Sequence, residues 1–345
     1  MAKIMKKNGM KTKKAKTAGP KGKRADILMI MFAAVVVIIG SVKVLSDIKP
    51  APDVKQINAE KIGEWGFSGD KVKKAGSLCG IALSPDNSYI YVASLDANMI
   101  HKMKLPEAAD REWTPVLSWG KTGDQPGQFN EVSGLAIDTD GNVYAADAAN
   151  SRVQKFDADG KYKSEINRSF YRPRTVIAAK AGMVYVADTG LSKLHRLDAQ
   201  GNATANPAGG RGKSAGEFLE VFGLAIDSKG RLFAADSGNA RIQVFSSDLL
   251  PLAQFKVKAW KTNNGGWPMI AIDSRDRLYA VSQKTNEIAV YDINDKSFKY
   301  MGTIKKSVNN EPLFVNPLGI AVDKEDNLYI TEMFKNMVVK IKPLF

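Results

Sequence analysis

The sequence predicts an all-β fold, a six-bladed β-propeller closed by a strand from its own N-terminal side and preceded by one transmembrane helix. Three observations lead to this prediction. A segment of 14 or 15 residues recurs six times along the chain. The last copy lacks the strand that would complete it. An apolar run of membrane-spanning length lies near the N-terminus.

The N-terminal region is first strongly basic and then strongly apolar. Residues 1–24 hold ten Lys and Arg and no acidic residue, so the formal net charge of +14 falls to +4 for the rest of the chain. The run Ile27–Leu45 follows and is almost entirely apolar. As a helix it would extend for about 28 Å, enough to cross a bilayer. Because the basic residues precede this run, the positive-inside rule places the N-terminus in the cytoplasm.

We therefore expect a single-pass protein of the cell (inner) membrane, with its main domain in the periplasm or outside the cell. The expected parts are a basic cytoplasmic tail (1–25), a transmembrane helix or signal anchor (26–45), a linker (46–59) and the propeller (60–345). A cleaved signal peptide is the alternative, since VLS at 44–46 resembles a cleavage site, but Lys43 fits it poorly. The single cysteine, Cys79, excludes an intrachain disulfide and is expected to be a small core residue.

The repeats are the strongest signal in the sequence. The six copies begin 41 to 54 residues apart and are GIALSPDNSYIYVAS (80–94), GLAIDTDGNVYAAD (134–147), TVIAAKAGMVYVAD (175–188), GLAIDSKGRLFAAD (223–236), MIAIDSRDRLYAVS (269–282) and GIAVDKEDNLYITE (319–332). All six carry an aromatic residue at the same place: Tyr91, Tyr144, Tyr185, Phe233, Tyr279 and Tyr329.

Each copy predicts the same series of antiparallel strands. A short apolar strand ends near an Asp, a turn such as DTDG (138–141) follows, and a second strand carries the aromatic residue. A second tight turn leads to a third strand, such as RVQKF (152–156) or RIQVF (241–245). A more variable fourth strand then leads to the next copy. Four antiparallel strands in every roughly 40 to 50 residues are typical of a propeller blade.

The sixth copy is incomplete, because the chain stops at Phe345 soon after its third strand, MVVKI (337–341). The segment KIGEWGFSG (61–69) reads as a strand with no unit before it to which it could belong. We therefore expect residues 61–66 to pair with residues 337–341. This pairing would remove two open sheet edges from the ring.

Two segments resemble a known repeat. Residues 123–156, GDQPGQFNEVSGLAIDTDGNVYAADAANSRVQKF, resemble the NHL repeat nearly end to end, and residues 216–245 do so almost as well. The resemblance covers about residues 60–345 and implies a six-bladed propeller of the NHL type. NHL propellers include RNA-binding, protein-binding and lyase members, which act through one face or through the axial channel. The resemblance therefore predicts the fold and leaves the function open.

An enzymatic site would be expected near the axis. The related amidating lyases and the lactonase-like propellers imply a metal held by His and acidic residues. His101 and His195, the two histidines, fall on third strands well away from the axis, where packing or hydrogen bonding between blades is the simpler interpretation. We predict no catalytic residue, no metal ligand and no cofactor.

The acidic residues of the repeats favour structural roles. DTDGN (138–142) resembles the start of an EF-hand loop, but Ala149 stands at its twelfth position, so we predict a hairpin turn. Three Asp residues precede a basic residue by five positions and predict turns or ion pairs: Asp147 with Arg152, Asp188 with Lys193, and Asp236 with Arg241. A weak cation site at one mouth of the channel is the alternative for the residues that end first strands: Asp138, Asp227, Asp273 and Asp323.

The loops that join the fourth strand of one blade to the first strand of the next form what we call the loop face. Basic and aromatic residues occur together there, as an anionic or protein partner would require. The candidate binding residues are Tyr171, Arg172, Arg174, Arg211, Lys213, Trp260 and Lys261. An ordinary solvated face is the competing interpretation, since these loops carry eleven basic and six acidic residues.

The predicted function is that of a membrane-anchored, extracytoplasmic binding or scaffold propeller. It would dock a protein or an anionic envelope polymer on the loop face, with the membrane contacted through Ile27–Leu45. The alternative is a propeller lyase or hydrolase whose active site lies at the mouth of the axial channel. Nucleic-acid binding would need the propeller in the cytoplasm and contradicts the predicted topology.

Overall fold

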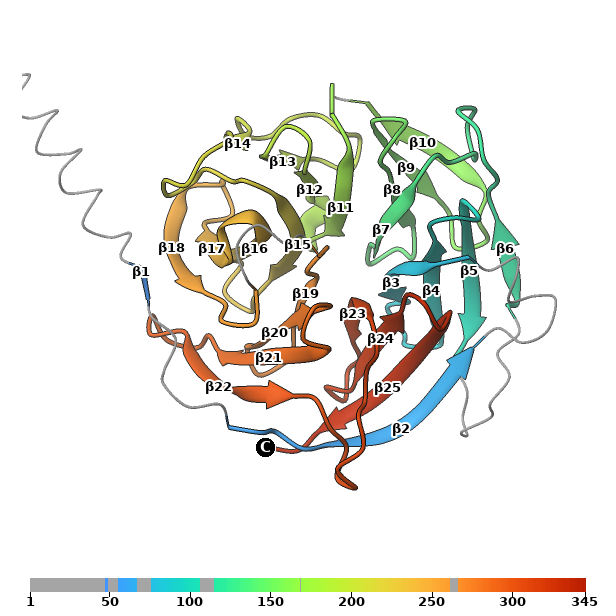
Figure 1. The fold of residues 1–345 in the computed structure, drawn as a ribbon. Helices are drawn as coiled ribbons and strands as arrows, with labels where there is room; N and C mark the ends of the chain where they lie inside the picture. The colour runs from blue at the N-terminus through green and yellow to red at the C-terminus, as the bar shows by residue number, and fades with distance from the viewer. Residues whose placement is uncertain (1–46, 49–54, 67–75, 106–114, 168, 261–265) are drawn as a thin grey trace, which may run out of the picture. The chain divides into compact units, whose positions relative to one another are not determined.

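Six β-sheets are arranged as blades around a central axis (Figure 1). The computed structural model describes residues 47–48, 55–66, 76–105, 115–167, 169–260 and 266–345, all within one compact unit, Leu45–Phe345. The six-bladed, all-β propeller predicted from the repeats is confirmed. No helix in these ranges is long and apolar enough to cross a membrane. The predicted tail and membrane span lie outside the described residues.

The first three blades each have four antiparallel strands. Blade 1 contains β3 (Leu78–Leu83), β4 (Tyr89–Ser94), β5 (Met99–Lys104) and β6 (Leu117–Trp119). Blade 2 contains β7 (Val132–Ile137), β8 (Val143–Asp147), β9 (Arg152–Phe156) and β10 (Tyr162–Ile166). Blade 3 contains β11 (Pro173–Ala178), the 3-10 turn η1 (Lys180–Gly182), β12 (Val184–Asp188), β13 (Lys193–Leu197) and the short β14 (Ala208–Gly209).

The last three blades follow the same order, and two of them gain strands from the N-terminal side. Blade 4 contains β15 (Val221–Ile226), β16 (Leu232–Asp236), the turn η2 (Ser237–Asn239), β17 (Arg241–Phe245), β18 (Pro251–Lys256) and, parallel to β18, the two-residue β1 (Asp47–Ile48). Blade 5 contains β19 (Ile270–Ile272), β20 (Arg277–Ser282), β21 (Glu287–Asp292) and β22 (Lys299–Ile304). Blade 6 contains β23 (Pro317–Val322), β24 (Leu328–Glu332), β25 (Met337–Pro343) and β2 (Ala59–Gly66).

The ring is closed by the strand predicted to close it. β2 pairs antiparallel with β25, with Trp65 opposite Val338 and Gly66 opposite Met337 (Figure 1). The Trp65 side chain is buried against residues of both blade 6 and blade 1, including Tyr329 and Ile90. Because β2 supplies the missing fourth strand, the two ends of the propeller belong to one sheet.

The segment before β2 is also attached to the propeller. The Ile57 amide donates to the Thr303 carbonyl at 2.9 Å, and the Thr303 amide donates to the Lys55 carbonyl at 2.9 Å. Ile57 is buried in a core cluster of blades 5 and 6. The expected linker (46–59) is therefore not free of contacts throughout. Contacts of the expected linker with the propeller begin at β1 (Asp47–Ile48), which pairs with β18, and occur again from Lys55, ahead of the expected boundary at residue 60.

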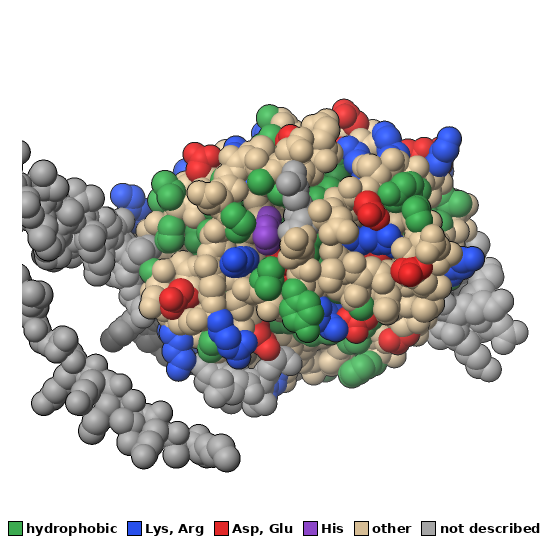
Figure 2. Space-filling model, turned by 90° about the horizontal axis from the view of Figure 1, so that it is seen from above, with side chains coloured by type: hydrophobic (Ala, Val, Ile, Leu, Met, Phe, Trp, Pro, Cys, Tyr) green, Lys and Arg blue, Asp and Glu red, His purple; other side chains and the backbone are tan. Residues whose placement is uncertain are grey.

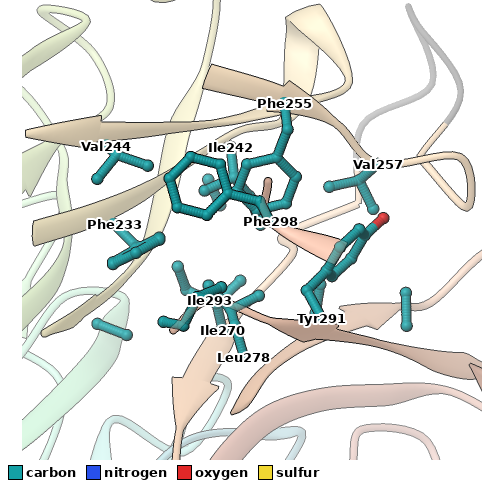
Figure 3. Close-up of a cluster of buried hydrophobic side chains, with 14 of the residues drawn as sticks. Phe233, Ile242, Val244, Phe255, Val257, Ile270, Leu278, Tyr291, Ile293 and Phe298 are labelled. Carbon is teal, nitrogen blue, oxygen red and sulfur yellow. The ribbon is translucent and has the colours of Figure 1, made fainter. Parts of the chain in front are cut away.

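Apolar side chains of neighbouring blades pack face to face. Between blades 4 and 5, Phe255 and Phe298 stack with their ring centroids 5.2 Å apart, and Tyr291 lies 4.9 Å from Phe255 (Figure 3). Near the axis the innermost strands crowd one another. A Cβ atom on Gly80 would lie 2.0 Å from the Ser133 carbonyl oxygen, so only glycine fits there. Crowding near the axis thus requires a small residue at this place in the innermost strand.

Removing β2 should destabilise the propeller, because the edge of β25 and the interface of blades 6 and 1 would both be exposed. A chain that starts at Lys55 loses only the two-residue pairing of β1 with β18 and should melt close to the full chain, whereas one that starts at Gly69 should melt well below it. Thermal unfolding followed by circular dichroism measures both. Equal melting temperatures would contradict the proposed role of β2.

Candidate functional site

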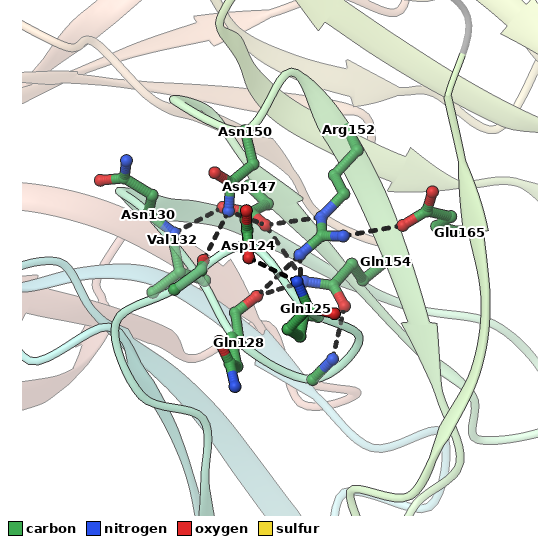
Figure 4. Close-up of polar contacts among 12 residues, drawn as sticks. Asp124, Gln125, Gln128, Asn130, Val132, Asp147, Asn150, Arg152, Gln154 and Glu165 are labelled. Carbon is green, nitrogen blue, oxygen red and sulfur yellow. Dashed lines mark hydrogen bonds and ion pairs between the residues drawn. The ribbon is translucent and has the colours of Figure 1, made fainter.

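A buried polar network fixes the loop that enters blade 2. Asp147 is fully buried, and its carboxylate accepts hydrogen bonds from Arg152 Nε at 2.9 Å, Asn150 Nδ2 at 2.9 Å and the Asn130 amide at 2.7 Å (Figure 4). Arg152 Nη2 donates to the carbonyl oxygens of Gln125 and Gln128, both at 3.0 Å. The backbone of residues 123–131 is thereby held against the blade by side chains of β8 and β9.

Blade 4 repeats this network. Arg241 Nε lies 2.8 Å from Asp236 Oδ2, and the guanidinium also donates to the Lys213 carbonyl at 2.7 Å and the Glu217 carbonyl at 2.8 Å. Two of the three predicted Asp–basic pairs are thus confirmed as buried ion pairs. The loop that carries Arg211 and Lys213 has a fixed backbone, and both of these side chains are exposed.

Blade 3 departs from this pattern. The Asp188 carboxylate accepts the Tyr171 amide at 3.0 Å and lies 3.6 Å from His195 Nε2, so His195 approaches it in place of the predicted Lys193. The His195 ring also packs edge-on against Phe170, with the ring centroids 5.0 Å apart. His195 therefore has a packing role within its blade.

His101 has a similar setting in blade 1. It is buried on β5, and its Nδ1 lies 2.8 Å from the Ser118 hydroxyl of β6. Burial lowers the pKa of His101 to about 4. Both histidines lie on third strands, as predicted, and their rings pack inside the sheets rather than at the axis.

The predicted binding residues of blade 3 divide into surface and interior. Tyr171 is 58% exposed. Arg172 forms an ion pair with Glu131, and Arg174 reaches the same carboxylate through Nη2 at 3.1 Å. Arg174 is buried and its guanidinium lies 4.4 Å from the centre of the Trp267 ring. Through these two contacts Arg174 braces blades 2, 3 and 5 rather than presenting a surface charge, and burial lowers the pKa of its guanidinium.

Trp260 is also interior. It is buried in the core between blades 4 and 5, and its Nε1 donates to the Val281 carbonyl at 2.8 Å. The expectation that it would offer an exposed ring is corrected, because the loop turns it toward β20. Lys261 lies outside the described residues.

Three exposed apolar side chains on the loop face were missed by the sequence reasoning: Leu191 (39% exposed), Val315 (48%) and Phe334 (74%). Leu191 stands where blades 2 and 4 carry the network residues Asn150 and Asn239. An apolar residue in a turn that is otherwise polar was the signal that could have revealed it. These residues and Tyr171 lie in the loops of blades 3 and 6, which occupy opposite sides of the ring (Figure 1).

The exposed apolar residues form two pairs. The Tyr171 ring lies against Gly190, where an added Cβ would be 2.4 Å from Tyr171 Cδ1, so Tyr171 neighbours Leu191. In blade 6 the Val315 amide donates to Glu332 at 2.9 Å, and the Met333 amide donates to the Asn316 carbonyl at 3.1 Å. This brings the loops of Val315 and Phe334 together. Each pair thus joins the loop before a first strand to the turn after a second strand.

Charge is not concentrated on the side of the molecule seen in Figure 2. Acidic and basic side chains alternate there, with hydrophobic side chains between them. Such a mixed surface gives no extended field of one sign.

The loop end of the axis is filled by side chains. Phe222 and Trp267 stack with their ring centroids 6.2 Å apart. Together with Cys79, Ser133, Arg174, Met269 and Leu318 they enclose only about 10 Å³, about enough for one water molecule. Farther along the axis the innermost strands line a cavity of about 280 Å³. Cys79 is buried, as predicted for a core residue, and burial raises the pKa of its thiol to about 12.

The Asp residues that end first strands close their own turns. Asp138 accepts hydrogen bonds from the Asn142 amide at 2.8 Å and from the Asn142 side chain, which makes DTDGN the predicted hairpin turn. Asp273 contacts Arg277 Nε at 2.5 Å and the Tyr279 hydroxyl at 2.8 Å. Among the described residues no group of three or more His, Cys, Asp or Glu is placed to hold a metal. The donors there do not fit the metal that the enzyme interpretation implies.

The opposite face, formed by the turns between first and second strands, is more open. We call it the turn face. A cavity of about 880 Å³ lies there, lined by residues of blades 3, 4, 5 and 6. It shares Ile177, Ala178 and Val322 with the lining of the axial cavity.

Comparison with known families agrees with the blade structure. Residues 223–245, which include most of β15 and all of β16 and β17, match the NHL repeat. The chain is a six-bladed β-propeller that carries an NHL repeat. Residues 70–183 also match the SMP-30/Gluconolactonase/LRE-like region.

The related proteins differ widely in kind. Protein brain tumor of Drosophila melanogaster is 23% identical over 146 residues, which are 38% of this chain and 13% of that protein. The probable peptidyl-alpha-hydroxyglycine alpha-amidating lyase pgal-1 of Caenorhabditis elegans is 23% identical over 236 residues, 63% of this chain and 65% of that protein. The chain thus matches less than two thirds of the length of either relative.

Solved structures share the fold. Virginiamycin B lyase from Staphylococcus aureus superposes with a TM-score of 0.57 at 16% identity over 82% of this chain and 98% of the lyase. Aldose sugar dehydrogenase from Streptomyces coelicolor, in its PQQ-bound form, gives 0.58 at 15% identity over 85% of this chain and 100% of that chain. At such low identity the likeness concerns the fold alone.

His101 should make the propeller less stable in mild acid. Its pKa is about 4 in the folded state and near 6.5 in an unfolded chain. Between these values the unfolded state binds a proton that the folded state does not, so the free energy of unfolding falls as the pH is lowered from about 6.5 to about 4.

His101→Gln introduces the residue that blades 2 and 4 carry as Gln154 and Gln243. It should weaken this pH dependence while leaving the fold intact. Urea unfolding of both proteins at pH 7.5, 6 and 5 measures the effect, and the other titrating groups cancel in the difference. The same dependence in both proteins would show that His101 does not titrate as inferred.

Proposed function

We propose that the propeller is a binding module that docks a partner protein on its loop face. The observation that carries the proposal is the exposure of Tyr171 with Leu191, and of Val315 with Phe334, on that face. Tyr and Phe are enriched at protein interfaces, where a few well-packed side chains supply most of the binding energy.

The fixed loop backbones support this proposal. The loops entering blades 2 and 4 are held by buried Arg152 and Arg241, so little backbone freedom would be lost on binding. The amides of Tyr171 and Val315 are held by Asp188 and Glu332, which fixes the loop backbones that carry the two exposed pairs. A partner would therefore meet a surface that is already organised.

A protein partner accounts for these residues better than an anionic polymer does. Arg172 is neutralised by Glu131, and Arg174 is buried against Trp267. The basic charge that suggested an anionic ligand is thereby reduced, while the apolar surface remains. Arg211 and Lys213 stay exposed and would lie at the rim of such an interface, where charges mainly steer association.

The alternative is a lyase or hydrolase that acts at the channel mouth. The similarity to pgal-1 over 63% of this chain favours it. Against it, the loop end of the axis is filled by Phe222, Trp267 and Arg174, and the described residues bring no set of metal donors together there. We therefore rank it second.

Phe334→Asp should abolish partner capture without unfolding the protein. Loss of a central apolar contact typically costs 2 kcal/mol or more, about thirtyfold in affinity. Crosslinking in intact cells, followed by identification of the crosslinked proteins, measures capture. Leu250→Asp is the matched control, since Leu250 is also well exposed (64%, against 74% for Phe334) but lies between β17 and β18, away from the loop face. Equal capture by both variants would contradict the proposal.

We further propose that Ile27–Leu45 anchors the propeller outside the cytoplasmic membrane. The support is the sequence alone, an apolar run of spanning length preceded by ten basic residues. Carbonate extraction should leave the protein in the membrane fraction. A mature protein released in soluble form with an N-terminus near Asp47 would show instead that the segment is a cleaved signal peptide.

A further inference from the structure

The cavity on the turn face has no role in loop-face docking. Its volume of about 880 Å³ lies within the range of small-molecule sites in proteins. The lining is mainly apolar near the axis and polar toward the rim, and it includes Ala178, Ala179, Lys180, Arg196, Ile226 and Ile272. Blade 3 contributes much of this wall, and its sequence differs from that of the other blades at two successive positions.

The first difference is the loss of an apolar side chain. The last residue of each innermost strand pairs with the first or second residue of the next strand, as Ile137 does with Val143 and Ala178 with Val184. The other blades place a larger aliphatic residue there: Leu83, Ile137, Ile226, Ile272 and Val322. Ala178 therefore leaves apolar volume unfilled beside the axis.

The second difference is the loss of a carboxylate. Blades 2, 4, 5 and 6 place an Asp at the next position: Asp138, Asp227, Asp273 and Asp323. In blade 2 the Asp138 carboxylate lies 3.3 Å from the Tyr144 hydroxyl and 3.5 Å from Lys155 Nζ. In blade 6, the Asp323 carboxylate lies 3.3 Å from the Tyr329 hydroxyl and 3.3 Å from Lys340 Nζ. Blade 3 has Ala179 at this position.

Blade 3 keeps the groups that would contact this carboxylate. Tyr185 and Arg196 pair with each other across β12 and β13, as Tyr144 and Lys155 do in blade 2. The Tyr185 hydroxyl donates instead to the Ser247 carbonyl at 2.8 Å. Within the described part of the chain, Arg196 Nε is buried and has no hydrogen-bond partner.

The remaining contacts of Arg196 do not replace the missing Asp. Its Nη1 donates to the Thr204 hydroxyl at 3.0 Å and lies 3.6 Å from Asp248, whose side chain is 69% exposed. Asp227 and Asp273 also line the cavity, but each is paired at 2.5 Å with its own arginine, Arg231 or Arg277. A guanidinium thus borders the cavity at the place where blades 2, 4, 5 and 6 hold a carboxylate.

We propose that this cavity binds a small amphiphile that carries a carboxylate. The carboxylate takes the place of the missing Asp and accepts hydrogen bonds from Arg196, and the exposed Lys180 adds positive charge at the rim. The apolar body fills the volume that Ala178 leaves, against Ile226 and Ile272. The cavity and the loop face are on opposite sides of the ring. A negative result for ligand binding in the cavity would therefore not bear on partner docking, and the reverse also holds.

Octanoate at concentrations below micelle formation is the probe, with 1-octanol as the neutral probe of equal chain length. Titration calorimetry on the full chain should show octanoate binding about tenfold or more tightly than octanol. This is the gain in affinity expected from one charge-assisted hydrogen bond between the carboxylate and Arg196. No binding of octanoate at millimolar concentration, or equal affinity for the two probes, would overturn the proposal.

Two variants restore what blade 3 lacks. Ala179→Asp supplies an internal carboxylate and should lower octanoate affinity about tenfold or more while changing octanol affinity little. Ala178→Ile refills the apolar volume and should weaken both probes together. Both introduce residues that other blades carry, so both should melt no lower than the natural protein.

Gln200→Glu is the control for charge, since it adds one negative charge to an exposed turn of the same blade outside the cavity lining. It should leave both affinities unchanged. If Gln200→Glu weakens octanoate as much as Ala179→Asp does, general repulsion explains the loss and the assigned head-group position is wrong.

Discussion

The antiparallel pairing of β2 with β25 is the contact on which the ring depends. Each blade packs mainly on its two neighbours, so an unclosed ring would expose one face of blade 1 and one face of blade 6. Trp65 lies in the cluster that joins these two blades, and the hydrogen bonds of β2 complete blade 6. The axial cavity and the arrangement of the loops on each face follow from the closed circle.

Within that ring the blades have diverged in how they treat their polar positions. Blades 2 and 4 use buried Asp147 with Arg152, and Asp236 with Arg241, to hold long loops in place. In blade 3, Lys193 stands in place of the arginine of this network. On the turn face of the same blade, Ala178 and Ala179 stand in place of a larger aliphatic residue and an Asp. Blades 2 and 4 thus hold the loops rigidly, whereas blade 3 provides the exposed apolar pair of the loop face and the cavity of the turn face.

Much of the fold follows from the sequence because each blade repeats the same alternation of apolar and turn residues. The third strands Arg152–Phe156 and Arg241–Phe245 were predicted with their observed bounds, since β-branched and aromatic residues fill them between clear turns. The attachment of Ile57 to blade 5 was not predicted, because a single apolar residue in a polar segment has no periodicity to reveal its partner.

The candidate sites were harder to predict than the fold. Trp260 and Arg174 were expected at the surface from their residue types, yet burial depends on neighbours distant in sequence, Val281 for one and Trp267 and Glu131 for the other. The turn-face cavity arises from side chains that are small or missing. Such a gap becomes visible only when Ala178 and Ala179 are compared with their equivalents in the other blades.

Closure by β2 also sets an order of events during synthesis. The eight residues of β2 leave the ribosome before any blade, but their partner, β25, is made only after the first five blades. At about 5–20 residues per second, β2 waits roughly 15 to 55 s for that partner. Throughout this interval a nascent chain displays an unmatched strand with an uncovered tryptophan. A holding chaperone, or early pairing with the wrong edge, would act on the protein at this stage.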